Sequence, residues 1–155
     1  MSESRIFIDA SVWIAAAGSS TGASAMVLAL CRENYAHPVA STIVLREAER
    51  NIRAKLGPEA LLRFYQDIAS LTLNLADTPT SEEIAAQSHI IAAKDAHVIA
   101  SALGAGVEVL LTLDRKHFFA REVVRANLPF RIMMPGDFLR KLTTIPKMKS
   151  SNRNR

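Results

Sequence analysis

Apolar residues along the chain follow two different periods, and the two periods alternate in short blocks. Residues 5–9 (RIFID) form a short run that is rich in β-formers, which predicts a strand. Residues 11–17 and 23–34 carry apolar side chains at helical spacing and flank a loop with two glycines at 18–22. A short apolar run at 39–41 predicts a second strand. The start of the chain therefore predicts strand, two helices and strand.

The same alternation continues to the end of the apolar sequence. Thr42 is a predicted N-cap, and Thr80 with Glu83 has the spacing of a capping box. Strands separated by helices of about ten residues predict an α/β fold with a parallel sheet covered by helices. The remaining predicted elements are helices over residues 42–56, 59–70, 84–92 and 96–103, strands over 71–75, 108–113 and 130–134, a helical turn after 114, and a helix over 135–142.

Three aspartates stand where such a sheet would bring them to one edge. Asp9 ends the first predicted strand, and Asp114 follows the strand at 108–113. Asp95 precedes the apolar helix that leads into that strand. The carboxyl ends of parallel strands share one edge of a sheet, where sites form. Each aspartate could instead be a helix cap, but three carboxylates at one edge would repel unless a cation lay among them. Oxygen ligands of this kind suit Mg²⁺ or Mn²⁺.

A fourth acid is expected from the helix that begins after residue 41. Glu47 and Glu49 are both candidates. At 100° per residue, Glu49 falls towards the core or towards Arg53, four residues further on, whereas Glu47 falls on a flank that could reach a cleft. Helical geometry therefore favours Glu47 and leaves Glu49 open.

Basic side chains flank these acids. Arg46, Arg50 and Arg53 form a stripe on the same helix, and Arg115 and Lys116 follow Asp114 directly. Such a stripe is often only a solvated surface. Beside an acidic centre, however, it would hold the phosphates of a nucleic acid.

Composition and charge narrow the class of protein. The chain has 155 residues, of which 49% are hydrophobic, enough for one domain with a buried core. The N-terminus lacks the pattern of a signal peptide, no apolar run is long enough for a membrane helix, and the single cysteine, Cys31, predicts a buried hydrophobe. A cytoplasmic location is therefore expected. The net charge of +4 comes from residues 141–155, which carry five basic side chains and no acid. We expect a folded domain over 1–142 and a disordered basic tail over 143–155.

Three segments of the chain resemble the signature blocks of PIN domains. They are FIDASVWI, STIVLREAERNI and KDAHVIASALGAGVEVLLTLDRKHF, and the resemblance covers roughly residues 6–142. It implies a three-layer α/β/α sandwich with a central, mostly parallel sheet and a metal-dependent nuclease site. The acids that match the family pattern are Asp9, Glu47, Asp95 and Asp114, and the accompanying hydroxyl residues are Ser11 and Thr112. Some members carry a further acid where this chain has His117, which would remove one ligand; surface or packing roles are favoured for this histidine and for His97.

The resemblance also implies an activity and partners. PIN domains are most often ribonucleases, and many act as toxins held in check by an antitoxin, commonly as homodimers. In the implied mechanism, the four acids hold one or two Mg²⁺ or Mn²⁺ ions and water attacks the phosphorus atom in line. A catalytically inactive PIN-like module that binds RNA or protein is the alternative. A dehalogenase-like phosphatase would need a second acid at Ser11, and no G-x-G-x-x-G segment supports dinucleotide binding.

Overall fold

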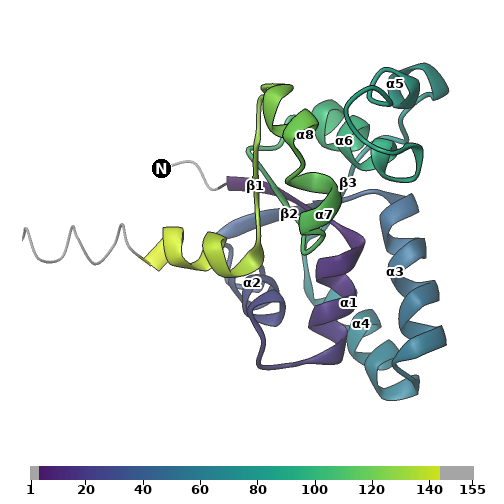
Figure 1. Cartoon of the computed structure of the whole chain (residues 1–155). Helices are drawn as coiled ribbons and strands as arrows, with labels where there is room; N and C mark the ends of the chain where they lie inside the picture. Colours follow the sequence, from purple (N-terminus) through teal and green to yellow (C-terminus); the bar gives the residue numbers. More distant parts are fainter. Residues whose placement is uncertain (1–3, 144–155) are drawn as a thin grey trace, which may run out of the picture.

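A parallel sheet of five strands forms the centre of the fold, in the order β3-β2-β1-β4-β5 (Figure 1). This computed structural model describes residues 4–143. All four strand pairings are parallel, so the predicted α/β fold with a parallel sheet is confirmed. The strands are β1 (Ser4–Ile8), β2 (Ala36–Ala40), β3 (Asn74–Leu75), β4 (Val109–Leu111) and β5 (Arg131–Met133).

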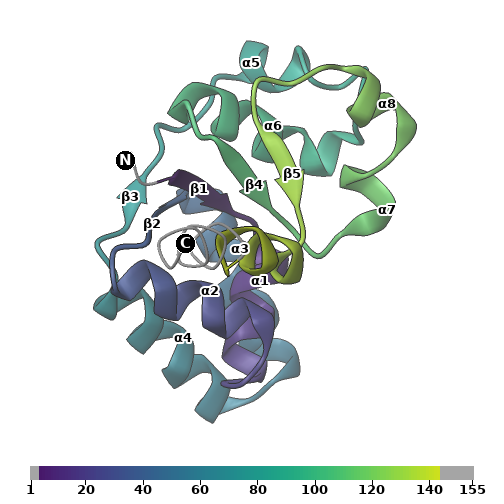
Figure 2. The same ribbon diagram turned by 90° about the vertical axis from the view of Figure 1, so that its left-hand side faces the viewer.

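Helices cover both faces of this sheet. Helices α1 to α4 pack together on one side, and α5 to α8 lie on the opposite side (Figure 2). A further helix runs from residue 135 to 143, where the described residues end, and its Phe138 lies in the core. The other helices are α1 (Ala10–Gly18), α2 (Ala23–Arg32), α3 (Thr42–Lys55), α4 (Pro58–Ser70), α5 (Ser81–Ala85), α6 (Ala93–Ala105), α7 (Arg115–Phe118) and α8 (Arg121–Arg125).

The central strand β1 explains why the core is continuous across the sheet. Its residues Ile6, Phe7 and Ile8 are completely buried, because helices cover both faces. β1 pairs with β2 on one side and with β4 on the other, with Ile8 opposite Leu111. The carboxyl ends of β1 and β4 therefore lie side by side, which fixes where the residues after them can reach.

Several element boundaries differ from the sequence prediction. The N-cap of α3 is Ser41, not Thr42; its hydroxyl accepts a hydrogen bond from the backbone N–H of Val44 at 3.1 Å. The capping box of Thr80 and Glu83 is confirmed, but α5 ends at Ala85 instead of continuing to residue 92. The apolar residues that suggested a longer helix, Ile90 and Ile91, are buried from a turn region instead. The apolar spacing of these two residues therefore reflects their burial and not a helix.

Two further expectations concern the ends and the membrane. The predicted basic tail over 143–155 falls almost wholly outside the described residues. Within the described residues, no single helix has the length and apolar character to cross a membrane, although α1 and α2 together pass that test as a pair bent by 100°. Both helices contribute buried residues to the core.

Trp13 supports the contact between α1 and the sheet, and its loss should lower stability. Its indole Nε1 donates a hydrogen bond to the carbonyl oxygen of Ile8 at 3.1 Å, and its ring meets Phe64 edge-on at 6.2 Å. Trp13→Phe keeps an aromatic ring but removes the donor, so we expect the free energy of unfolding to fall by about 1–3 kcal/mol. Urea unfolding followed by far-ultraviolet circular dichroism measures this, because the variant contains no tryptophan.

Tyr35→Phe is a suitable control for that measurement. Tyr35 is 64% exposed, so loss of its hydroxyl should change the free energy of unfolding by less than about 0.5 kcal/mol. Equal stability of Trp13→Phe and Tyr35→Phe would show that the buried hydrogen bond contributes nothing.

Candidate active site

The adjacent carboxyl ends of β1 and β4 bring Asp9 and Thr112 into contact. The Thr112 hydroxyl donates to Asp9 Oδ2 at 2.8 Å and accepts the backbone N–H of Asp114 at 3.1 Å. Ser11 has a matching arrangement: its hydroxyl donates to the same Asp9 oxygen at 3.0 Å and accepts the backbone N–H of Leu113 at 3.0 Å. Two hydroxyls therefore fix the Asp9 carboxylate and tie it to the segment that carries Asp114.

Asp9 is a buried carboxylate, and its surroundings make the charged form unfavourable. Burial raises the pKa of the Asp9 carboxyl above its ordinary value, and the hydrogen bonds from Thr112 and Ser11 offset only part of that rise. The nearby Glu47 carboxylate raises the Asp9 pKa further. Glu47 lies on α3, and its charge is the smallest of these causes.

Asp95 enters the site from the first turn of α6 without capping the helix. The N-cap position is Ala92, so the alternative that Asp95 is the N-cap of this helix is wrong. Asp95 Oδ2 is buried and accepts no hydrogen bond from any described residue. Lys94 Nζ lies 3.2 Å from that oxygen as an ion pair, but without the geometry of a hydrogen bond. The Lys94 ammonium therefore offsets part of the charge on this buried oxygen, and a divalent cation could take over that role.

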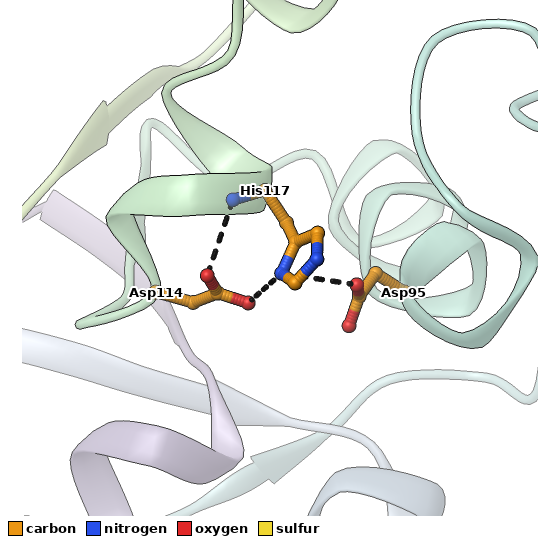
Figure 3. A group of neighbouring side chains, drawn as sticks. All are labelled: Asp95, Asp114 and His117. Carbon is orange, nitrogen blue, oxygen red and sulfur yellow. Dashed lines mark hydrogen bonds and ion pairs between the residues drawn. The ribbon is translucent and has the colours of Figure 1, made fainter.

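Asp114 combines the cap of α7 with a contact to His117. Asp114 Oδ1 accepts the backbone N–H of His117 at 3.1 Å, and Oδ2 lies 2.7 Å from His117 Nδ1 (Figure 3). Burial acts to raise the pKa of Asp114, but the hydrogen bonds and charge of His117, with the charge of Lys94, outweigh it and hold that pKa below its ordinary value. The capping interpretation of this aspartate is therefore correct, and the same carboxylate also faces the site.

His117 brings two of the predicted acids together. Its Nδ1 lies 3.9 Å from Asp95 Oδ2, and the imidazole stands between Asp95 and Asp114 (Figure 3). Ligand atoms of these three residues lie within 4.8 Å of one another, which forms a candidate metal site. Within the described part of the chain this cluster does not include Asp9 or Glu47; Asp9 is joined to it through Thr112.

The sequence favours a surface or packing role for His117 and does not predict its position between Asp95 and Asp114. The sequence signal for this contact was the spacing in DRKH (residues 114–117). A residue three positions after an N-cap aspartate lies next to the aspartate side chain.

Glu47 and Glu49 point to different neighbours. The Tyr65 hydroxyl donates to Glu49 Oε2 at 2.8 Å, and Arg53 donates to the same hydroxyl at 3.2 Å. Glu49 therefore belongs to a contact between α3 and α4. Of the two glutamates, it is Glu47 that acts on Asp9.

The predicted basic residues and Cys31 have simple surroundings. Arg46 and Arg50 are exposed on α3, and Arg115 and Lys116 are exposed on α7 next to Asp114. Arg53, also exposed, has the Tyr65 hydroxyl as a partner. Cys31 is buried in the core, and burial raises the pKa of its thiol to about 12. The expectation of a small buried hydrophobe is thus confirmed.

The donor set at this edge fits a divalent cation. It offers carboxylate oxygens from Asp95 and Asp114 and an imidazole nitrogen from His117 within one cluster, with the fixed carboxylate of Asp9 next to it. The buried Asp95 Oδ2 without a hydrogen bond is the kind of atom that a cation satisfies. Chemically, such a site can activate water and stabilise charge on a phosphate.

Comparison with solved structures places this fold among known proteins. PAE2754 from Pyrobaculum aerophilum has 18% sequence identity and a TM-score of 0.61, and the match covers 91% of this chain and 96% of that one. Mycobacterium tuberculosis VapC20, a Sarcin-Ricin loop cleaving toxin, has 15% identity, a TM-score of 0.55 and coverage of 79% and 95%. VapBC2 from Rickettsia felis, solved bound to a DNA fragment from its promoter, has 13% identity, a TM-score of 0.58 and coverage of 84% and 98%.

Sequence comparison assigns the family. Comparison with curated protein sequences gave no match. The family profile described as PIN domain matches residues 5–116, from β1 into α7, a segment that contains all four predicted acids. Since this match spans most of the sequence and the fold agrees with it, the chain belongs to the PIN domain family, a family of nucleases.

Proposed function

We propose that this protein is a divalent-metal-dependent endoribonuclease that acts in the cytoplasm as the toxin of a type II toxin–antitoxin pair. The observation that carries the proposal is the cluster of Asp95, Asp114 and His117. The buried carboxylate of Asp9 accepts a hydrogen bond from Thr112, whose hydroxyl in turn accepts the backbone N–H of Asp114. Membership of a nuclease family supports the reaction class. Similarity in fold to VapC20, a Sarcin-Ricin loop cleaving toxin, and to VapBC2 supports the toxin–antitoxin setting.

The four acids of the site would hold Mg²⁺ or Mn²⁺. Asp9 is oriented by Ser11 and Thr112, Asp114 by its capping contact in α7, and Asp95 by the first turn of α6. Glu47 would complete the set from α3. A bound cation would lower the pKa of water and neutralise charge that develops on the scissile phosphate. Thr112 links the Asp9 carboxylate to the backbone N–H of Asp114, so its hydroxyl is a positioning group.

RNA cleavage with and without metal tests this function directly. We expect a single-stranded RNA to be cut in millimolar Mn²⁺ or Mg²⁺ and left intact in EDTA. A thermal melt should also show a higher melting temperature with Mn²⁺ than with EDTA, because a ligand that binds the folded state stabilises it. Metal binding without cleavage of any RNA would favour the inactive binding module instead.

Glu47 and Glu49 give a paired test of the fourth acid. We expect Glu47→Gln to lower the cleavage rate by at least about tenfold, because a neutral amide is a weaker ligand for a divalent cation than a carboxylate. Glu49→Gln should leave the rate unchanged, because its carboxylate contacts Tyr65 on α4. Initial cleavage rates of both variants under identical metal concentrations decide the matter. A larger loss of cleavage rate in Glu49→Gln than in Glu47→Gln would identify Glu49 as the fourth acid instead.

The exposed basic residues are proposed to hold RNA phosphates. Two of them, Arg46 and Arg50, lie on α3, the helix that carries Glu47. The other two, Arg115 and Lys116, lie on α7, which directly follows Asp114. We expect Arg50→Ala to weaken RNA binding several-fold and to reduce the slope of log affinity against log salt by about 1, as for one lost phosphate contact. Filter binding at several salt concentrations measures both quantities.

Arg131→Ala is the matched control for that experiment. Arg131 is also exposed, but it begins β5 and therefore lies at the amino-end edge of the sheet. Its loss should leave the salt slope unchanged. Equal effects of Arg50→Ala and Arg131→Ala would indicate only general electrostatic attraction.

An antitoxin and a second copy of the chain are the proposed protein partners. Met26 on α2 and Leu62 on α4 are apolar side chains that are more than half exposed, and these two helices are the proposed homodimer surface. Sedimentation of the purified chain, alone and with the product of a neighbouring reading frame, tests both partners.

A further inference from the structure

The imidazole of His117 lies between the carboxylates of Asp95 and Asp114 (Figure 3). His117 is the third residue of the one-turn helix α7, and both oxygens of Asp114 contact it: one accepts its backbone N–H and the other faces Nδ1. The imidazole faces both acids (Figure 3). The residue lies one position beyond the segment that matches the PIN domain profile.

The distances around Nδ1 agree with those between ligands of one ion. Two atoms bound to the same ion at about 2.1 Å stand about 3.0 Å apart when adjacent and at most about 4.2 Å apart when opposite. His117 Nδ1 lies 2.7 Å from Asp114 Oδ2 and 3.9 Å from Asp95 Oδ2. The Asp95 distance lies within this range, and the Asp114 distance is the shorter one of a hydrogen bond. The hydrogen bond between Nδ1 and Asp114 is a contact that a cation bound to both atoms would replace.

We infer that His117 Nδ1 is a ligand of the catalytic cation, and that this nitrogen biases the site towards first-row transition ions over Mg²⁺. The inference rests on the proposed metal-dependent function and adds a residue outside the four acids. Imidazole nitrogen binds transition ions well, whereas Mg²⁺ prefers oxygen ligands and retains its waters. The chain thus has a mixed nitrogen and oxygen site in place of an all-oxygen one.

Pulsed electron paramagnetic resonance of Mn²⁺ bound to the full chain tests the inference without an activity assay. We expect a ¹⁴N coupling from a directly bound imidazole in the wild type and its loss in His117→Ala. His89→Asn is the matched control, because His89 is exposed and outside the cluster, and its spectrum should keep the coupling. Competition between Mn²⁺ and Mg²⁺ adds a second readout: His117→Asp should lower the ratio of Mn²⁺ to Mg²⁺ affinity by at least about tenfold.

Each outcome decides a different statement. Mn²⁺ bound to the wild type without a ¹⁴N coupling, or with a coupling that persists in His117→Ala, would overturn the role of His117 and leave the metal-dependent function standing. Failure of the wild type to bind Mn²⁺ would overturn both. The wild-type spectrum alone shows whether a nitrogen is bound, so the test holds even if a variant folds poorly.

Discussion

Asp95→Asn should lower the rate of RNA cleavage by at least about a thousandfold while leaving the fold intact. The side chain keeps its size but loses the charge of the buried oxygen that accepts no hydrogen bond from any described residue. Several kcal/mol of transition-state stabilisation from a held cation corresponds to about that factor in rate. Stability should change by less than about 1 kcal/mol, because Asp95 does not cap α6.

Cleavage rates in Mn²⁺ and melting temperatures in EDTA, measured on the same preparations, separate these two effects. Glu108→Gln provides the matched control, since Glu108 is an exposed acid that precedes β4 at the amino-end edge of the sheet. Its rate should equal that of the wild type. Full activity of Asp95→Asn would remove Asp95 from the mechanism.

Asp9→Asn should abolish cleavage to a similar degree and, in addition, stabilise the metal-free protein. Burial and Glu47 both raise the pKa of Asp9, so its charged form is unfavourable in the folded state when no cation is present. Asparagine keeps an oxygen that can accept the hydrogen bonds from Ser11 and Thr112 but carries no charge. We expect the melting temperature in EDTA to rise by a few degrees at neutral pH, and the stabilisation by Mn²⁺ to disappear.

The pH dependence of this stability difference has a definite sign. Because the pKa of Asp9 is higher in the folded than in the unfolded state, the folded state binds more protons between those two values, and wild-type stability falls as pH rises through them. The advantage of Asp9→Asn over the wild type should therefore shrink as pH falls below the raised pKa. Urea unfolding in EDTA over a pH series measures it.

Asp114→Asn should change the free energy of unfolding in the opposite direction to Asp9→Asn in the same experiment. The pKa of Asp114 is lowered, so its charge stabilises the fold above the ordinary pKa, and that contribution is lost as pH falls through the folded value. This variant should be less stable than the wild type at neutral pH. A metal-free Asp9→Asn protein that is also less stable there would contradict a cost of the buried Asp9 charge.

The order of strands and helices could be predicted from the sequence because local pattern and tertiary burial agree over most of the chain. In β1, the run Ile6, Phe7 and Ile8 is apolar on both faces, as a central parallel strand requires. The sequence prediction and the structure differ where apolar residues at helical spacing are buried without forming a helix. Ile90 and Ile91 continue a helical pattern in the sequence but reach the core from a turn, so the predicted extension of α5 was wrong.

The positions of Asp9 and Asp114 were predictable for a related reason. Parallel strands place the residues that follow them at one edge, so the backbone alone brings these acids near each other. The sequence left Glu47 and Glu49 open, because both lie on the same helix and only the partner on the adjoining element distinguishes them. In the structure that partner is Tyr65 for Glu49, sixteen residues away.

By itself, then, the sequence determined the α/β class, the parallel sheet and the edge at which the acids meet, because these depend on periodicity and on residues that directly follow strands. Tertiary structure decided the directions of the side chains. It left Asp95 Oδ2 buried without a hydrogen bond and folded the His117 ring between two carboxylates. The contact of His117 with Asp114 has a local signal in the DRKH spacing, but its approach to Asp95 brings together residues of α6 and α7, which no local pattern in the chain encodes.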